Sequence, residues 1–389
     1  MKKLKCDCLL VCGKVNRGLI INNKLYSQIL DTIGDELNNL EVNTVSIGWE
    51  HENFRIEKSF YGKSLNLSLK LLSKRLLYKI SSIYKNNPPF LEEFYLDLFA
   101  EIQPKYIIGI LPSIQLCISA KKLGIKVFDI QHGVIGSYEN EFYTLKYREK
   151  YFQNGWPDYI LTWNQNTSDW VNKNFNKYTD SFCIGNPMTI KFNNTDINDF
   201  YKKNNINFYN QYLYHNNKKI LLTLGYNLTK YGLNSQYGLT KELIDVIKKT
   251  DDYLWLIRVH PVILRSKNSE LIEILNQEFY KIKNRVEWEL SSTLPLPIIL
   301  KEVDFHITTI SATCIEADLY GIKTGMLADE KVINSLYQTE VSTGVVFSIK
   351  NNTNEILKTI NGIMINSKNK NITDTNFKKF INGIKNKTL

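Results

Sequence analysis

Residues 304–323, DFHITTISATCIEADLYGIK, contain a complete strand-to-helix unit. The apolar run Asp304–Thr309 predicts a buried strand, and Ser311 is a natural N-cap for a helix from Cys314 to Tyr320. Gly321 then suits the end of that helix. A strand that leads through a capped helix into another apolar run is typical of a parallel α/β sheet.

The same alternation of apolar runs and amphipathic stretches extends over most of the sequence. In the first half the expected strands are Lys5–Cys12, Asn43–Ile47, Tyr106–Ile110, Lys126–Gln131, Tyr159–Thr162 and Phe182–Ile184. In the second half they are Lys219–Leu224, Tyr253–Val259, Arg285–Trp288, Asp304–Thr309, Lys323–Leu327 and Val345–Ile349. Helical patterns occur at 23–38, 64–84, 90–102, 113–123, 166–174, 239–250, 268–283, 296–302, 312–320 and 352–364. Continuous apolar strands separated by helices indicate parallel sheets covered on both faces.

A polar, Asn-rich segment divides this pattern in two. Residues 191–217 carry few aliphatic side chains, which is typical of an interdomain connection. The sequence therefore predicts two doubly wound, Rossmann-like α/β domains that face a central cleft. The first domain spans residues 1–190, and the second spans residues 218–389 and ends in a helical tail. Ligands of such sheets bind at the carboxyl ends of the strands.

The composition excludes several classes of protein. The chain has 389 residues, of which 43% are hydrophobic, so it can form packed cores. No apolar run approaches the roughly 18 residues that a membrane span needs. The first residues, MKKLKCDCLLVCGKVNRG, have a short apolar stretch and no small-residue cleavage site. They predict a first strand, and we expect a cytoplasmic protein.

The charge is strongly basic: 49 Lys and Arg minus 39 Asp and Glu gives +10. This balance suits nucleic acid, an anionic lipid surface or a phosphorylated substrate, and it also arises by drift in a Lys/Asn/Ile-rich proteome. Because no RNP motif, zinc-finger spacing or compact basic run occurs, we expect no nucleic acid partner. The six cysteines form no C-x-x-C pair, which indicates buried thiols instead of disulfides or a zinc site.

The first candidate site residue is His132, which follows the expected strand Lys126–Gln131 directly. Gly133 would let the backbone turn there, and the imidazole can accept a proton from a hydroxyl group. Glu139 and Glu141 lie in the same loop and could serve as the base. The alternatives are a turn histidine bonded to local backbone and ordinary solvated acids.

A second histidine occupies the equivalent position in the second half. His260 and Pro261 follow the strand Tyr253–Val259, and proline ends a strand because it has no N–H to donate. Arg258 lies two residues earlier and therefore on the same face of the strand as His260. The alternative is a structural histidine at a turn.

The helix start after Asp304–Thr309 is a candidate phosphate site. Free N–H groups at a helix N-terminus suit an anion, the hydroxyls of Ser311 and Thr313 can donate, and Glu316 can accept from a ribose. An ordinary capped helix is the alternative. The segment Trp288–Leu294, after the third strand of this half, is expected to select the nucleobase.

Two further segments have more than one interpretation. Gly185, Asn186 and Pro187 lie where the chain passes to the second domain and are expected to form a hinge or a cleft wall. The stretch 64–84 carries apolar residues at 65, 69, 72, 76, 80 and 83 with interspersed lysines and arginine. It can rest on anionic lipid, but packing of this stripe on the sheet is the favoured interpretation.

Four short motifs occur in order along the chain: Gln131-His132-Gly133, Gly185-Asn186-Pro187, His260-Pro261 and Ser311-x-Thr313-x-x-Glu316-Ala317. Together they resemble bacterial GT-B glycosyltransferases of surface-polysaccharide synthesis. The His-Pro dipeptide and the later Ser-containing helix start are similar to motifs of sialyltransferases and Kdo transferases, which bind the CMP part of their donor. Here Ser-Ala-Thr stands in place of adjacent serines, and the acidic-acidic-Gly signature of some sialyltransferases is absent.

The resemblance implies a metal-independent transferase without a cofactor. It would move a sugar from a nucleotide-activated donor to a lipopolysaccharide, O-antigen or capsule glycan. The donor is expected to be a CMP-sugar such as sialic acid or Kdo, with a UDP-sugar as the alternative. The acceptor is expected to be lipid-linked, which allows peripheral contact with the inner membrane. Alternative functions are a CDP-glycerol-type polyol-phosphate transferase, a nucleotide-sugar epimerase and a non-catalytic binding protein.

Overall fold

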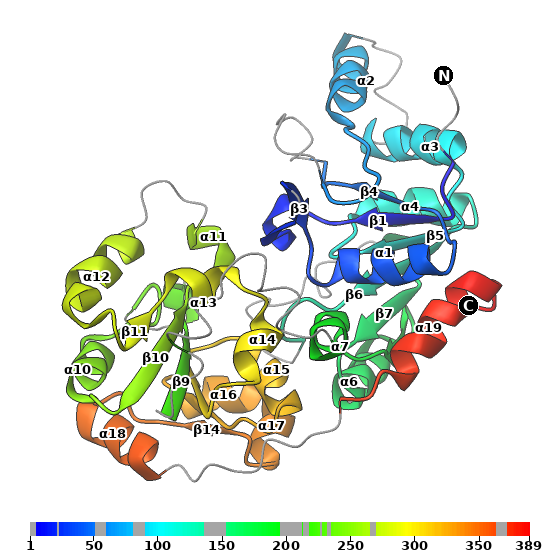
Figure 1. Ribbon diagram of the computed structural model, residues 1–389. Coiled ribbons are helices and arrows are strands. Elements are labelled where there is room, and N and C mark those ends of the chain that lie inside the picture. Colours follow the sequence, from blue (N-terminus) through cyan, green and yellow to red (C-terminus); the bar gives the residue numbers. More distant parts are fainter. Residues whose placement is uncertain are drawn as a thin grey trace. The chain divides into compact units, whose positions relative to one another are not determined.

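The computed structural model describes two compact units, each with one six-stranded sheet (Figure 1). The described residues are 5–21, 23–50, 60–80, 90–135, 153–194, 212, 218–225, 228–231, 235–264, 270–362 and 372–389. The first unit comprises Met1–His132, Tyr143–Met188 and Thr373–Leu389, and the second comprises Gly133–Phe142 and Thr189–Ile372.

The sheet of the first unit has the strand order β4-β1-β5-β6-β7-β8, and every neighbouring pair is parallel. Its strands are β1 (Cys8–Val11), β4 (Thr44–Ile47), β5 (Tyr106–Gly109), β6 (Lys126–Ile130), β7 (Tyr159–Thr162) and β8 (Asp180–Cys183). Strands β1, β4 and β5 are buried along their whole length, which explains why the sequence shows apolar runs instead of alternation. The six strands expected in the first half are all present.

Helices cover both faces of this sheet. They are α1 (Leu30–Asn39), α2 (Ser68–Ile80), α3 (Phe90–Ile102), α4 (Ile114–Lys122), α6 (Gln165–Phe175) and α19 (Thr375–Asn386), with the 3₁₀ turns η1 (Lys14–Asn16) and η4 (Gln153–Gly155). Helix α7 (Pro187–Asn194) begins in this unit and continues into the second. Leu9 and Ile107 belong to the core on the α3 and α4 side. On the opposite face Leu10 contacts Gly34 of α1, and Phe128 packs against Phe380 of α19.

The C-terminal helix belongs to the first unit, whereas the sequence analysis placed residues 218–389 together in the second domain. The ring of Phe380 lies 5.6 Å from that of Phe128 and 6.2 Å from that of Phe182. Phe128 in turn stacks on Tyr159 at 5.1 Å. This column of aromatic rings on β6, β7 and β8 leaves an apolar face that α19 covers, and sequence proximity gives no sign of that partner.

A β-hairpin occupies part of a predicted helix. Strands β2 (Leu19–Ile21) and β3 (Lys24–Tyr26) pair antiparallel, whereas the sequence analysis expected a helix over 23–38. Asn23 has a φ of 61°, the left-handed conformation that two-residue hairpin turns require and that asparagine tolerates. The helix α1 therefore begins only at Leu30.

Helix α2 packs through a different face from the one expected. Of the predicted stripe, Leu69, Leu72 and Leu76 are exposed, and only Leu65 among the described side chains packs against the core. The buried leucines of this segment are instead Leu67 and Leu71. The interpretation that the stripe packs on the sheet is thus wrong for its three central leucines.

The sheet of the second unit has the order β11-β10-β9-β12-β13-β14 and is also parallel throughout. Its strands are β9 (Lys218–Thr223), β10 (Tyr253–Arg258), β11 (Val286–Glu287), β12 (Phe305–Thr308), β13 (Thr324–Met326) and β14 (Val346–Ser348). All six expected strands of the second half are present. The predicted α/β fold class with two doubly wound sheets is confirmed.

The second unit contains nine described α-helices, several of them short. They are α10 (Lys241–Lys249), α11 (Pro261–Leu264), α12 (Glu270–Phe279), α13 (Glu289–Thr293), α14 (Leu296–Leu300), α15 (Thr313–Leu319), α16 (Glu330–Leu336), α17 (Gln338–Ser342) and α18 (Thr353–Gly362), with the 3₁₀ turns η6 (Leu228–Tyr231) and η7 (Tyr280–Ile282). One core joins Ile220, Trp255 and Phe305 of the strands to Val246 of α10 and Phe279 of α12. Among the described residues, none of the helices combines the length and the hydropathy that crossing a bilayer demands.

Candidate functional site

The strand order of the second sheet defines where a ligand site is expected. From β9 the chain runs through β10 to β11 on one side and then returns to β12 on the other side of β9. The connections leave in opposite directions between β9 and β12, and ligands of open α/β sheets bind outside the carboxyl ends of the strands at such a switch point. The loops that follow Thr223 and Thr308 therefore border the candidate site.

Ser311 lies in the loop that follows β12 and holds the start of α15. Its Oγ accepts from the backbone N–H of Thr313 at 3.2 Å and donates to the hydroxyl of Thr313 at 3.0 Å. Its carbonyl accepts from the hydroxyl of Tyr337 at 3.1 Å. Gly321, with a φ of 72°, follows the end of the helix. The sequence analysis predicted Ser311 as the N-cap, but Ala312 occupies that position and makes no side-chain capping bond. Ser311 instead accepts from the N–H of the first helical residue, one position before the N-cap.

Glu316 is buried inside α15, with only 6% of its surface exposed. Its charge acts on a neighbour: burial first, and then the Glu316 carboxylate, raise the pKa of the Tyr320 phenol. A buried carboxylate needs compensation by charge or hydrogen bonds. The expected contact of Glu316 with a ribose stays a prediction.

His260 follows β10, the neighbour of β9, at the carboxyl edge of the sheet. Its carbonyl accepts from the N–H groups of Ile263 at 2.9 Å and Leu264 at 3.3 Å, so Pro261 occupies the first position of α11. Proline is favoured there because its fixed φ suits a helix and its missing N–H is not needed. The imidazole itself is half-buried. The strand thus ends where the His-Pro dipeptide predicted.

Arg258 binds protein backbone in this structure. Its Nη1 donates to the carbonyls of Ser291 at 2.6 Å and Leu294 at 2.8 Å. The hydroxyl of Ser291 donates to the carbonyl of Ile257 at 2.7 Å, and that of Ser292 accepts from the N–H of Val259 at 2.9 Å. These contacts fix α13 to the end of β10. Sequence reasoning, which assigned Arg258 to the nucleotide, had no signal for this positioning role.

Glu287 caps α13 from the preceding strand. Its two carboxylate oxygens accept from the N–H groups of Leu290 at 2.6 Å and Ser291 at 2.8 Å. Burial raises the pKa of Glu287, while these backbone donors oppose that shift. The segment Trp288–Leu294, expected to select a nucleobase, is therefore a short capped helix whose serine hydroxyls are bonded to β10. Its contact with a base stays a prediction.

His306 is a buried polar residue that sequence reasoning did not single out. Its Nε2 bonds the hydroxyl of Thr223 at 2.9 Å, and its Nδ1 bonds that of Thr324 at 2.9 Å. The imidazole thus links β9, β12 and β13 across the middle of the sheet. Burial lowers its pKa to about 3, so it is neutral at neutral pH. A histidine in an otherwise apolar strand was the available signal.

His132 follows β6 in the first unit. In this sheet the switch point lies between β1 and β5, and β6 is the next strand. Burial lowers the pKa of His132 to about 4, which keeps the imidazole in the neutral form that can accept a proton. The preceding Gln131 is buried, and its Oε1 accepts from the N–H of Trp163 at 2.8 Å. This bond fixes the end of β6.

The loop after His132 departs from the prediction at one position. Gly133 does not have a positive φ, and a Cβ on it would meet no atom within 4 Å. The backbone bends at Gly133, as expected, but neither its conformation nor its surroundings require glycine at this position. The two loop acids, Glu139 and Glu141, lie outside the described residues.

The segment Gly185-Asn186-Pro187 begins helix α7. Gly185 has a φ of 84°, and the Oδ1 of Asn186 accepts from the N–H of Met188 at 3.0 Å. At the other end of the helix the ammonium of Lys301 donates to the carbonyls of Phe192 and Asn193. The boundary between the two units falls inside α7, after Met188. A role of the segment as a hinge stays a prediction.

A polar cluster at the carboxyl edge of β4 and β5 was missed by sequence reasoning. Glu50 is half-buried, and its Oε1 accepts from the hydroxyl of Tyr95 at 2.6 Å and from that of Ser113. Ser113 also caps α4 by accepting from the N–H of Leu116 at 3.3 Å. Burial, and then the Glu50 carboxylate, raise the pKa of Tyr95, which keeps its phenol a donor. The cluster holds one carboxylate beside the switch point.

The loop between β5 and α4 contains a backbone conformation that is rare for its residue type. Leu111 has a φ of 50°, and its N–H donates to the Oδ1 of Asp129 at 3.0 Å. The indole of Trp49 donates to the carbonyl of Ile110 at 3.1 Å, and its ring leaves no room for a Cβ on Gly13. Non-glycine residues adopt positive φ at a cost, and such positions concentrate at functional sites.

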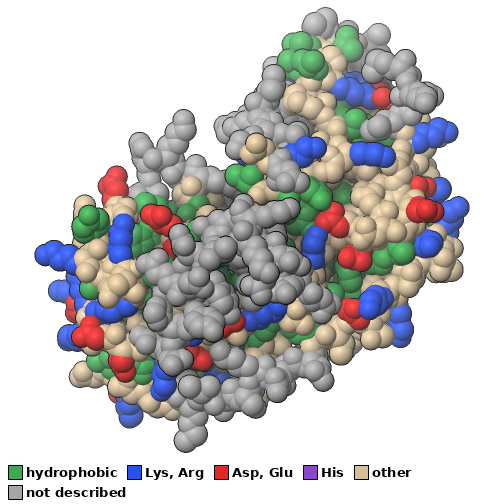
Figure 2. Space-filling model, viewed as in Figure 1, with side chains coloured by type: hydrophobic (Ala, Val, Ile, Leu, Met, Phe, Trp, Pro, Cys, Tyr) green, Lys and Arg blue, Asp and Glu red, His purple; other side chains and the backbone are tan. Residues whose placement is uncertain are grey.

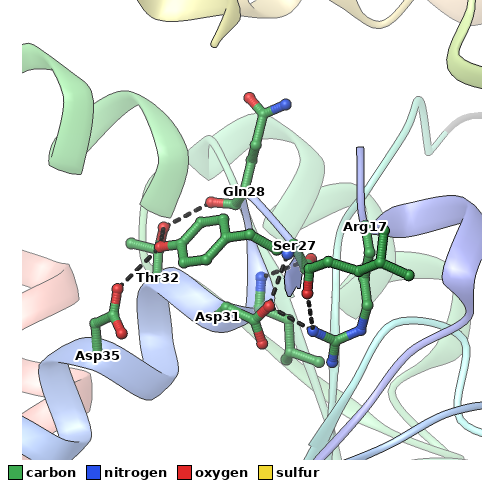
Figure 3. Close-up of polar contacts among 9 residues, drawn as sticks. Arg17, Ser27, Gln28, Asp31, Thr32 and Asp35 are labelled. Carbon is green, nitrogen blue, oxygen red and sulfur yellow. Dashed lines mark hydrogen bonds and ion pairs between the residues drawn. The ribbon is translucent and has the colours of Figure 1, made fainter. Parts of the chain in front are cut away.

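Arg17 and Asp31 form a buried ion pair beneath the loop that follows β1 (Figure 3). Their side chains are 0% and 2% exposed. The Oδ2 of Asp31 also accepts from the N–H of Ser27 at 2.7 Å, and the guanidinium of Arg17 lies 4.2 Å from the ring centroid of Phe60. Burial raises the pKa of Asp31 to about 6 although Arg17 opposes the shift. The pair ties the loop 13–18 to α1.

Comparison with known proteins shows the fold. No family model matches the sequence, and no curated protein matches it. Solved structures match almost the whole chain. UDP-GlcNAc 2-epimerase from Methanocaldococcus jannaschii has a TM-score of 0.61 and 13% identity, over 96% of this chain and 98% of that one.

Two further solved structures show the same similarity. The UDP-GlcNAc 2-epimerase from Neisseria meningitidis, bound to UDP-GlcNAc, has a TM-score of 0.55 and 12% identity over 97% of this chain and 94% of that one. The wall teichoic acid polymerase TagF has a TM-score of 0.59 and 12% identity over 99% of this chain and 84% of that one. The chain therefore has the GT-B fold of these proteins, as the sequence motifs predicted.

Proposed function

We propose that the protein is a metal-independent transferase that moves a sugar from a nucleotide-activated donor to a glycan acceptor. One observation supports this most directly. The second sheet has its switch point between β9 and β12, and the Ser311–Thr313 helix start follows β12 while His260 follows the adjacent β10. Sheets of this order bind nucleotides at that edge.

On the donor side, His260, Ser311 and Thr313 would stabilise the leaving phosphate. Charge that develops on a leaving group is best stabilised by dipoles fixed before the reaction, and the bond from Thr313 N–H to Ser311 already fixes this helix start. A CMP-sugar, such as a sialic acid or Kdo donor, is favoured by the resemblance of the motifs. A UDP-sugar is the other candidate, because a structural neighbour is bound to UDP-GlcNAc.

On the acceptor side, a group of the first unit would take the proton of the attacking hydroxyl. His132 is our first candidate because it follows β6 at the carboxyl edge of the sheet and carries an imidazole, which can accept a proton. Glu139 and Glu141 are the carboxylate alternatives. The proposed acceptor is a lipid-linked lipopolysaccharide, O-antigen or capsule glycan, and the reaction would take place in the cytoplasm.

Two other activities remain candidate functions because structural neighbours of this chain support them. An epimerase would isomerise a nucleotide sugar without an acceptor, and two of the neighbours are UDP-GlcNAc 2-epimerases. A polyol-phosphate transferase of the CDP-glycerol type is supported by the similarity to a teichoic acid polymerase. A screen of CMP-, CDP-, UDP- and GDP-activated donors separates these activities. Nucleotide release that requires an acceptor indicates transfer, and isomerisation without acceptor indicates an epimerase.

The nucleotide site is tested by thermal shift with CMP, CDP, UDP and GDP. We expect one nucleotide to raise the melting temperature and His260→Ala to abolish that rise, whereas the exposed control Ser342→Ala keeps it. His132→Ala is expected to keep the nucleotide-induced rise but to stop turnover. A full rise in the His260→Ala protein would contradict the proposed donor site.

A further inference from the structure

Helix α2 carries a row of exposed leucines. Leu69, Leu72, Leu76 and Leu77 are 81%, 42%, 51% and 58% exposed. In the described part of the chain, the other large apolar side chains with comparable exposure occur singly: Ile20 on β2, Leu123 after α4 and Tyr280 in η7. Scattered apolar side chains are normal on a protein surface, but a contiguous group marks an interaction site.

Contacts with α3 hold α2 so that these leucines point away from the core. Lys70 pairs with Glu101, and Lys74 lies 2.7 Å from Asp97. Leu71 is buried in the core cluster beneath. Because residues three and four apart share a helix face, fixing the side with Lys70, Lys74 and Leu71 leaves Leu69, Leu72 and Leu76 on the opposite side. Leu77, three residues after Lys74, lies on the same side as the two lysines. Figure 2 shows apolar side chains gathered at this outer end of the first unit.

The sequence around α2 is uniformly basic. From Lys58 to Leu91 the chain has no Asp or Glu, and it has seven cationic residues: Lys58, Lys63, Lys70, Lys74, Arg75, Lys79 and Lys85. The acids that neutralise Lys70 and Lys74 lie on α3. On α2 itself Arg75 is exposed and lies three positions after Leu72, which makes the two residues neighbours on the helix surface. An exposed row of apolar side chains in a basic segment is complementary to an anionic lipid bilayer, in which negatively charged headgroups cover an apolar layer of acyl chains.

We propose that the α2 surface, formed by Leu69, Leu72, Leu76 and Arg75, docks on an anionic phospholipid bilayer. The leucines would enter the boundary between headgroups and acyl chains, and Arg75 would contact headgroup phosphates. A flat lipid interface offers no groove, and a single convex helix can bind without one. The proposal does not depend on the transferase chemistry, although a lipid-linked acceptor would lie at the same surface.

The test is cosedimentation of the full-length protein with lipid vesicles. We expect binding to vesicles of phosphatidylcholine mixed with phosphatidylglycerol, and much weaker binding to phosphatidylcholine alone. The variant Leu72→Glu/Leu76→Glu should bind the mixed vesicles at least about tenfold less well, because it removes apolar contact and adds negative charge. Arg75→Glu should weaken binding and its dependence on salt.

Matched controls make the outcome decisive. Leu123→Glu changes an exposed leucine outside α2 and should bind as the unchanged protein does. Thermal unfolding of each variant checks folding, and Leu76→Gln replaces the double variant if that one unfolds. Three results would overturn the proposal: no binding to mixed vesicles, full binding by the folded α2 variants, or equal binding to both lipids. A dimer that the α2 variants convert to monomer would assign the surface to a second copy instead.

Discussion

At the level of single residues, buried polar side chains hold the loops and helices at the carboxyl edge of each sheet in place. Arg258 and Glu287 bind backbone groups of α13, and Asp129 binds the N–H of Leu111. In each case a charged or acidic side chain satisfies backbone groups at a strand end, where the ladder no longer does so. The edges that border the candidate site are thus fixed before any ligand binds.

The buried imidazole of His306 makes stability depend on pH. Its folded pKa is about 3, below the ordinary value of 6.5, so the unfolded chain binds more protons between these values. The contribution of His306 to the free energy of unfolding is therefore fully present above about pH 6.5, and it is lost as the pH decreases toward 3. Each pH unit in that window removes about 1.4 kcal/mol per such group.

When the pH is lowered, we expect the free energy of unfolding to decrease less in the His306→Gln variant than in the unchanged protein. The free energy of unfolding, measured by urea titration at about pH 7 and about pH 4.5, checks this. His132, whose pKa is also lowered, contributes a slope of the same sign, so the variant should keep part of the pH dependence. An unchanged difference between the two pH values would contradict the role given to His306.

At the level of elements, the loop after β9 closes over the end of β12. Gly238 has a φ of 82°, and a Cβ there would clash with the hydroxyl of Thr309. The N–H of Gly238 also donates to Ser235 Oγ at 3.0 Å, and the N–H of Gly225 donates to the carbonyl of Tyr237 at 3.0 Å. This loop therefore depends on one glycine for its position beside the switch point.

Gly238→Ala is expected to destabilise the protein by more than about 1 kcal/mol, because it adds backbone strain to a steric clash. Gly362→Ala is the matched control, since it lies at the end of α18 and a Cβ there meets nothing within 4 Å. Alanine is the better helix former, so the control should be neutral or slightly stabilising. Equal unfolding midpoints of the two variants in urea would refute the argument.

The strands were predictable from the sequence because a strand buried on both faces of its sheet consists of a continuous run of apolar residues. The run Tyr253–Val259 contains β10, which ends one residue earlier at Arg258, and the prediction Tyr159–Thr162 matches the bounds of β7. The hairpin β2–β3 was missed because Asn22-Asn23 lacks the glycine of the common two-residue hairpin turns, although asparagine tolerates the positive φ that such turns require. The apolar stripe of α2 was misassigned because periodicity alone does not say whether a partner covers it.

The candidate site was predictable where a residue ends a strand. His132, His260 and Ser311 all follow strands at carboxyl edges, as their positions in the sequence indicated. Residues that act through distant partners left no such signal. Glu50 meets Ser113 across 63 positions of sequence, and no local pattern announces that contact.

At the scale of the whole molecule, the chain returns to its first unit at the C-terminus. Helix α19 buries Phe377, Phe380, Ile381 and Ile384, and the ring of Phe380 packs on those of Phe128 and Phe182. Helix α19 thus covers the apolar face of the first sheet over β6, β7 and β8. The stability of the first unit should depend on α19, whereas that of the second should not.

Phe380→Ala tests this dependence. Removing a buried phenylalanine typically costs about 3–5 kcal/mol, so amide hydrogen exchange should accelerate in β6, β7 and β8 and stay unchanged in β9 and β10. Phe279→Ala, which removes a fully buried ring from the core of the second unit, should give the opposite pattern. Exchange is the appropriate measurement because two units need not unfold in one transition. Faster exchange in β9 and β10 of the Phe380→Ala protein would mean that α19 supports the second unit, as the sequence alone suggested.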